Sequence, residues 1–189
     1  MRFSKFTIKN YKGISSDIEI DLTKNSLFPI IGVNECGKTT ILNAIFAFDK
    51  FNDGQNHKIG QLNDVENLFE ISNKEAQITS EIEISYEDLK DIINDLDLDS
   101  EIKKIDLLYA LKQIDKKEKD HNKLDFKSIK FISKKNYSGK IKITRFISKG
   151  KSRYEFSEPK LSLAKYHKLT EEIICSAIVG NLPYILYFD

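Results

Sequence analysis

Residues 32–39 read Gly-Val-Asn-Glu-Cys-Gly-Lys-Thr, which matches the phosphate-loop pattern G-x-x-x-x-G-K-[ST] at every fixed position. A backbone that wraps around a phosphate chain turns several N–H groups inward, and Gly32 and Gly37 allow that conformation without strain. Lys38 supplies an ammonium group for the β- and γ-phosphates, and the Thr39 hydroxyl is a ligand for the Mg²⁺ that bridges them. The octapeptide therefore predicts a site for a nucleoside triphosphate with Mg²⁺.

The segments on both sides of the loop give the motif the context it requires. Leu27 to Ile31 is a short apolar run typical of a buried strand, and Thr39 to Phe48 has the apolar spacing of a helix. The start of such a helix adds a positive partial charge beside the phosphates. The residues expected around the nucleotide are Gly32, Val33, Asn34, Glu35, Cys36, Gly37, Lys38, Thr39 and Thr40, and the apolar residues with helical spacing are Ile41, Leu42, Ile45 and Phe48.

Two strand-like segments precede the loop, whereas simple GTPases and nucleotide kinases usually open with the strand that feeds it. They are Arg2 to Asn10 and Asp17 to Leu22, with Lys12-Gly13 as the turn between them. An early antiparallel pair of strands is the layout of ABC-type ATPase heads. We therefore expect an α/β fold, a P-loop NTPase of ABC-head type.

Three segments, residues 6–14, 20–22 and 31–45, carry a resemblance to a known group of proteins. The chain resembles the N-terminal lobe of SMC- and RecF-like ATPases, and more closely that of OLD-type (overcoming lysogenization defect) ATPases. The likeness is specific over about the first 50 residues. It implies ATP as the nucleotide, a head-to-head homodimer, a nuclease or other effector domain beyond this chain, and a role in DNA repair or anti-phage defence.

The first turn of the chain is a further candidate, by the same resemblance. In such proteins residues of this turn lie near the base or the phosphates, which implicates Asn10, Tyr11 and Lys12. The alternative is an ordinary turn.

The other motifs of a hydrolysing head are not evident in the sequence. Gln61 is a candidate for the glutamine that senses the metal, although a surface polar residue is the favoured alternative. Ser138-Gly139 is the nearest approach to the signature motif, but its position predicts a hairpin turn. Asp189 ends an apolar strand-like run and is a candidate metal ligand; alternatively the acidic strand lies in a missing C-terminal part, and we expect a fragment of a longer protein.

The remainder of the chain predicts an insertion and a completing meander. The expected division is a nucleotide-binding lobe over 1–85, a helical insertion over 86–125, and a β meander with a helix over 126–189. The insertion opens with Ser85-x-x-Asp88, a helix start. The expected strands are 78–84, 127–133, 140–147 and 153–156; the expected helices begin at 85 and 100, and a last one spans 162–179 with Tyr166, Leu169, Ile173, Ile174 and Ala177 inward.

The composition favours a cytoplasmic protein. Cys36 and Cys175 have no metal-ligand spacing, and Cys36 would be an unusual disulfide partner inside a phosphate loop. No signal peptide follows Met1, and no apolar run approaches the roughly 18 residues of a membrane span.

The formal net charge of +1 conceals an uneven distribution of charge. Residues 61–100 hold 12 Asp and Glu against 2 Lys, whereas residues 101–153 hold 17 Lys and Arg against 6 Asp and Glu. The second segment is a candidate surface for DNA phosphates, which attract Lys without sequence preference. A solvated Lys-rich surface is the stronger alternative.

Two other classes of function remain open at this point. A small-molecule kinase uses the same loop but needs a lid rich in Arg, and the chain has only Arg2, Arg145 and Arg153. A non-catalytic regulatory module would bind nucleotide for stability alone.

Overall fold

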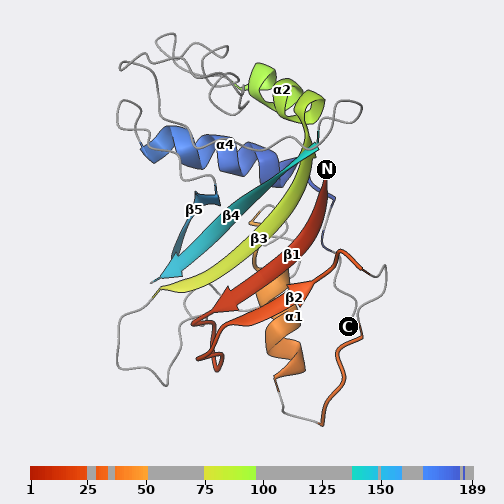
Figure 1. Ribbon diagram of the computed structural model, residues 1–189. Helices are drawn as coiled ribbons and strands as arrows, with labels where there is room; N and C mark the ends of the chain where they lie inside the picture. The colour runs from red at the N-terminus through yellow and green to blue at the C-terminus, as the bar shows by residue number, and fades with distance from the viewer. Residues whose placement is uncertain are drawn as a thin grey trace, which may run out of the picture.

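One five-stranded antiparallel sheet organises the chain in the computed structural model, which describes residues 1–24, 29–33, 37–50, 75–96, 138–148, 150–158, 168–183 and 185 (Figure 1). The strand order is β2-β1-β3-β4-β5, and each neighbouring pair is antiparallel. The strands are β1 (Arg2–Lys9), β2 (Ile18–Asp21), β3 (Ala76–Ser85), β4 (Ser138–Ser148) and β5 (Lys151–Glu158). The expected early pair of strands is therefore confirmed.

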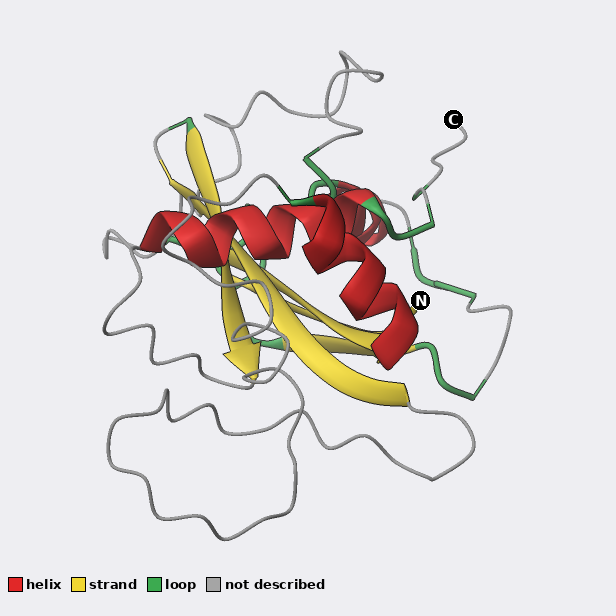
Figure 2. Cartoon of the chain, turned by 90° about the horizontal axis from the view of Figure 1, so that it is seen from above, coloured by secondary structure: helices red, strands yellow, loops and turns green. Residues whose placement is uncertain are grey.

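Within the described residues, three helices accompany the sheet: α1 (Lys38–Phe46), α2 (Tyr86–Asp95) and α4 (Lys168–Gly180). Figure 1 places α2 and α4 together near one end of the strands and α1 behind β1 and β2. Seen from above in Figure 2, α4 crosses the strands. Buried residues of all three helices join those of the sheet in a single hydrophobic core.

The central strand β3 shows why the sheet has an apolar and a polar face. Its side chains alternate in burial along the whole strand, as expected when one face packs against the core. The strand register places the apolar side chains of neighbouring strands opposite one another: Ile82 lies opposite Ile141, and Ile78 lies opposite Ile8. The predicted strand over 78–84 is confirmed and extends one to two residues further at each end.

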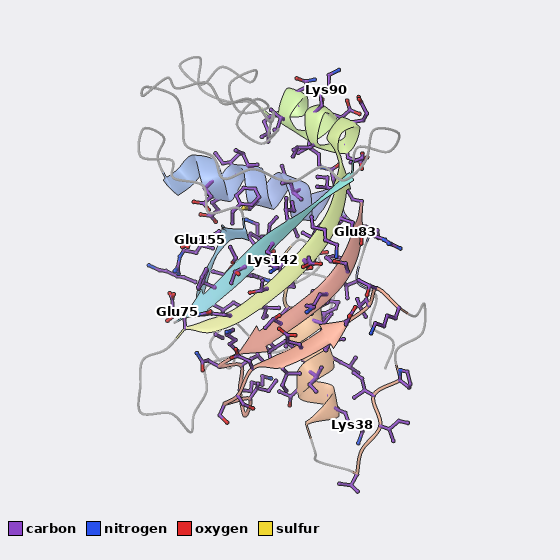
Figure 3. All side chains as sticks on the ribbon, in the orientation of Figure 1. Lys38, Glu75, Glu83, Lys90, Lys142 and Glu155 are labelled. Atoms are coloured by element: carbon purple, nitrogen blue, oxygen red, sulfur yellow. The ribbon has the colours of Figure 1, made fainter. Side chains whose placement is uncertain are left out.

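The other face of the sheet carries charged side chains that pair across the strands. Lys140 on β4 donates to Glu81 on β3 at 2.7 Å, and Lys5 on β1 lies 3.2 Å from Glu19 on β2. Figure 3 shows Glu83 and Lys142 on this face. Cross-strand pairs of opposite charge hold the register on a face that has no apolar core to fix it.

A complete capping box starts α2, as the Ser85-x-x-Asp88 pattern predicts. The Asp88 N–H donates to Ser85 Oγ at 3.1 Å, and the Ser85 N–H donates to the Asp88 carboxylate at 3.3 Å. Hydrogen bonding of the Ser85 side chain to the Asp88 carboxylate, with smaller contributions from the Ser85 N–H and the chain's amino terminus, lowers the pKa of Asp88 below its usual range against an opposing effect of burial. Leu89, Ile92 and Ile93 of α2 are buried.

The edge strand β5 is covered in part by a side chain from α4. The backbone N–H of Phe156 donates to the Glu171 carboxylate at 2.7 Å. An amide that would otherwise face outward from the sheet edge therefore has its acceptor within the chain.

Three predictions about secondary structure are wrong. Ser138-Gly139 does not form a turn, because both residues begin β4 and pair with Ser85 and Ile84 of β3. Ile173 is exposed on α4, where Ile174, Cys175, Ile178 and Val179 are buried instead. Residues 29–31, expected at the end of a buried strand, have no strand structure, and Ile31 is 90% exposed.

The last error has a physical reason. A strand needs neighbouring backbone for its N–H and C=O groups, and within the described residues the sheet places β3 and β2 on the two sides of β1 and leaves 29–31 outside the ladder. The apolar sequence alone does not supply that partner.

Several predictions fall outside the described residues. They are the strand over 127–133, the helix starting at 100, and the first part of the last helix, of which 168–180 is seen. The division of the chain at 85/86 and 125/126 stays a prediction. None of the described helices has both the length and the apolar character needed to cross a membrane.

A candidate nucleotide site at the start of α1

Gly37 turns the chain into α1. It occupies the N-cap position with φ +90°, the left-handed conformation that residues with a side chain rarely adopt. A Cβ added here would meet nothing within 4 Å, so the backbone conformation, and not crowding, requires glycine. The Ile41 N–H then donates to the Gly37 carbonyl at 3.0 Å as the first helical bond.

The first turn of α1 is suited to an anion. Its first N–H groups have no intrahelical acceptors, and Gly37, the N-cap residue, has no side chain to accept from them. No acidic residue lies in the turn. Aligned peptide dipoles add a positive partial charge at the same place. The backbone therefore provides donors and positive potential where the motif predicts phosphates.

The Lys38 side chain folds over the preceding loop. Its Nζ donates to the Gly32 carbonyl at 2.7 Å and to the Val33 carbonyl at 2.6 Å. The ammonium group thus already lies against oxygens with partial negative charge, on the loop that the motif assigns to phosphates. Phosphate oxygens carry a full charge and would compete well for the same donor.

The described part of the site is open to solvent. Gly32 and Thr39 are exposed, Lys38 and Thr40 are half-buried, and the Val33 side chain is 79% exposed. Asn34, Glu35 and Cys36, the other expected members, lie outside the described residues.

The opposite end of α1 is held by two side chains that the sequence analysis did not single out. Arg145 on β4 is 1% exposed, and its Nη1 donates to the Ala47 carbonyl at the end of the helix. Tyr154 on β5 donates its hydroxyl proton to the next carbonyl, that of Phe48. A sequence signal for Arg145 did exist, because it occupies an apolar phase of β4 between Ile143 and Ile147.

The same cluster reaches α4 through Lys50. The Lys50 N–H donates to the Tyr154 hydroxyl at 3.0 Å, while its Nζ donates to Ser176 Oγ at 2.9 Å and lies 5.2 Å from the centre of the Tyr154 ring. Arg145 also donates to Ser152 at 3.0 Å. Strands β4 and β5 and helix α4 therefore all bond to the chain at the end of α1.

Lys12, a low-ranked candidate for phosphate contact, lies in the turn after β1. Both Asn10 and Lys12 have positive φ, 51° and 49°, and the Lys12 Nζ lies 6.0 Å from the centre of the Tyr11 ring. A positive φ is uncommon for a lysine. Its role beside the nucleotide stays a prediction.

Predicted metal ligands apart from Thr39 cannot be placed. Gln61 and Asp189 lie outside the described residues. Within the described ranges, no group of three His, Cys, Asp or Glu residues is arranged to hold a metal ion.

Two basic side chains at the described end of the Lys-rich segment pair with acidic side chains. Lys140 pairs with Glu81, and Arg153 pairs with Glu75 at 2.6 Å and with Glu155 at 2.7 Å. The hydrogen bond from Arg153 lowers the pKa of Glu75, against a smaller opposing effect of burial. These strands carry charge of both signs.

Cys175 is buried, so its thiol is not available as a nucleophile. It lies in the core on α4, and burial, followed by nearby carboxylates, raises the pKa of its thiol well above the usual value. The inert thiol form is therefore favoured.

Comparison with known proteins gives a family match and structural likenesses to solved proteins. A solved structure described as "Structural biochemistry of ATP-driven dimerization and DNA stimulated activation of SMC ATPases" is similar over 94% of this chain and 80% of that chain, with 15% identity and a TM-score of 0.47. No curated protein sequence matches the chain. The family model of the AAA ATPase domain matches residues 1–186 and bears out the predicted α/β fold of a P-loop ATPase. The chain belongs to the AAA ATPase domain family.

Proposed function

We propose that this chain binds Mg-ATP through residues 32–40 and forms the ATP-binding part of an SMC- or OLD-like ATPase. The observation that carries the proposal is the conformation of the loop end. Gly37 is left-handed directly before α1, and Lys38 lies over the loop carbonyls at 2.6 and 2.7 Å. A coincidental sequence match would not require this backbone.

Each residue has a distinct task in this proposal. The N–H groups of the first turn of α1 bind phosphate oxygens, and Lys38 exchanges its carbonyl partners for the β- and γ-phosphates. The exposed Thr39 hydroxyl holds Mg²⁺. ATP supplies the phosphoanhydride bond, and the positive groups of the loop stabilise negative charge that develops on its oxygens.

The exposed apolar side chains beside the loop support the head-to-head homodimer that the resemblance implies. Ile31 and Val33 precede the loop end and are 90% and 79% exposed, and Leu42 on α1 is 40% exposed. Exposed apolar groups beside a ligand site favour a surface that another molecule covers. A second copy of the chain, with ATP between the two, is the occupant we propose.

Completion of the site for hydrolysis rests on groups beyond the described residues. Gln61 and Asp189 stay candidates as metal ligands, and Lys12 as a phosphate contact. We expect low turnover by this chain alone, because the signature and acidic strand of a hydrolysing head are not evident in its sequence. The larger role, DNA processing or anti-phage defence in the cytoplasm, follows from the resemblance.

DNA contact through this chain is a weaker part of the proposal. Lys140 and Arg153 are paired with glutamates. Any DNA surface would therefore depend on the Lys-rich residues 101–137, and its binding would fall steeply with added salt.

Mg-ATP titration of the purified chain tests the proposal, with Lys38→Ala as the variant and turnover measured in parallel. Binding that requires Lys38, with little turnover, is the expected result. Rapid turnover by a monomer would favour a complete enzyme such as a kinase, and thermal stabilisation by ATP without dimers would favour a regulatory module. Equal binding by both proteins would contradict the proposed site.

A further inference from the structure

The two ends of α1 differ in what holds them, and this difference suggests a role for residues distant from the phosphates. At its start α1 follows an open loop, with Thr39 exposed. At its far end, Arg145 and Tyr154 donate to the Ala47 and Phe48 carbonyls. We call Arg145, Tyr154 and Lys50 the helix anchor.

The helix anchor satisfies carbonyls that the helix cannot satisfy itself. The Phe48 and Asp49 N–H groups donate to the Ile45 and Phe46 carbonyls at 3.1 and 3.2 Å, and the next two carbonyls accept from the anchor. A buried guanidinium at this end also complements the negative end of the helix dipole.

Aromatic packing adds to the hydrogen bonds at the same end. The Phe48 ring lies edge-on to Tyr154 at 5.8 Å and to Phe6 at 5.7 Å between ring centres. Directional bonds and interlocked rings together fix the position and the tilt of the helix end. The anchor therefore fixes the direction of α1 relative to the sheet.

The tilt of α1 matters at the phosphate site because the full length of the helix separates the anchored end from the first turn. Nine residues span about 14 Å, so a tilt of about 10° around the anchored end moves the first turn by about 2 Å. Displacements of about 1 Å at a reacting group can lower a rate by about 100-fold. A small change in tilt at the anchored end therefore displaces the first turn of α1 enough to misplace its N–H groups relative to the phosphates.

We infer that Arg145 and Tyr154 are positioning residues for the nucleotide site: by bonding the last carbonyls of α1, they hold its first turn in the orientation that binds phosphate. The inference rests on the proposed function. Lys50 extends the anchor to Ser176 of α4 and makes that helix part of the same support.

The test compares Mg-ATP affinity in two variants of the full chain that lose similar thermal stability. Tyr154→Phe removes the hydroxyl that bonds Phe48 and Lys50 but keeps the ring. Ile141→Val is the control, because Ile141 is buried on the same face of β4 but pairs with Ile82, away from the Arg145 register position. We expect the dissociation constant to rise about tenfold in Tyr154→Phe and to stay within about twofold in Ile141→Val.

A second readout separates positioning from general support. Hydrogen exchange at the amides of residues 38–41 should be slowed less by Mg-ATP in Tyr154→Phe than in the wild type and Ile141→Val. Arg145→Lys, which keeps a charged donor, should retain more affinity than Arg145→Met. If Arg145→Met does not fold, Tyr154→Phe still decides.

The outcomes distinguish the inference from the function on which it rests. A wild-type chain that binds no Mg-ATP would overturn both. A wild-type chain that binds through Lys38, with unchanged affinity in Tyr154→Phe or equal losses in Tyr154→Phe and Ile141→Val, would overturn the positioning role alone.

Discussion

The anchored end of α1 and the phosphate-loop end form one continuous helix but belong to different physical environments. Around Ala47 and Phe48 the side chains are buried, and carbonyls are matched by donors from two strands. Around Gly37 the backbone is left-handed, the first N–H groups of the helix lack intrahelical acceptors, and apolar side chains face solvent. The buried contacts that stabilise the helix therefore lie at one end, and the proposed ligand site lies at the other.

The largest effect that would test this separation lies in the core. Ile82 is fully buried at the centre of β3, so Ile82→Ala should lower the free energy of unfolding by about 3 kcal/mol. Urea denaturation measures the loss, and Mg-ATP affinity below the transition should not change. As a control, Val33→Ala in the exposed loop should change stability by less than about 0.5 kcal/mol. A comparable loss in Val33→Ala would break the comparison.

The reverse pattern is expected for Lys38→Ala. Loss of charge-assisted bonds of about 2 to 3 kcal/mol corresponds to a rise of about 30- to 140-fold in the dissociation constant for Mg-ATP. Unfolding should be almost unchanged. Lys90→Ala, on the exposed face of α2 (Figure 3), is the matched control and should leave both affinity and stability near the wild-type values.

Gly37→Ala should affect both properties, because it alters the backbone where the two regions meet. A side chain at φ +90° costs about 1 to 2 kcal/mol of folding stability, although nothing crowds the new methyl group. Thermal unfolding measures this cost, and titration should show weaker Mg-ATP binding. Gly13→Ala also has open space but no positive φ, so it should be tolerated. Similar losses in the two variants would argue against backbone strain at Gly37.

The smallest expected effect is on the pH dependence of stability, and it comes from the ion pair between Arg153 and Glu75. The Arg153 hydrogen bond lowers the pKa of Glu75 in the folded chain, so the pair stabilises the fold above the unfolded pKa, and this contribution is lost as pH falls through the folded pKa. Both side chains are more than a third exposed, at 35% and 42%, which limits the contribution to about 0.5 kcal/mol.

Glu75→Gln should therefore show a slightly flatter decline of unfolding free energy from about pH 5 to pH 3 than the wild type does. Asp91→Asn, an exposed change on α2, serves as the control. An unchanged slope in Glu75→Gln would mean that the pair contributes nothing measurable to stability.

Local patterns in the sequence predicted much of the fold. Alternation in β3, the capping box of α2 and the glycines of the loop each depend on neighbours within a few residues, so their physical causes are visible in the sequence itself. The match to the phosphate-loop pattern likewise identified the family-level activity.

The errors arose where distant backbone decides the outcome. Residues 29–31 are as apolar as a buried strand but are not seen with a strand partner, and Ser138-Gly139 have turn-forming composition but pair with β3. The anchor was missed because Arg145 and Ala47 lie far apart in the chain and meet only after the sheet forms. The available signal was the position of Arg145, a charged residue among the apolar side chains that alternate along β4.

The bond from Phe156 to Glu171 has a consequence for the behaviour of the protein in concentrated solution. A strand from a neighbouring molecule that approached β5 would have to displace a carboxylate already bonded to this amide, and would bring its own carbonyl against that negative charge. The contact therefore disfavours stacking of chains through this edge.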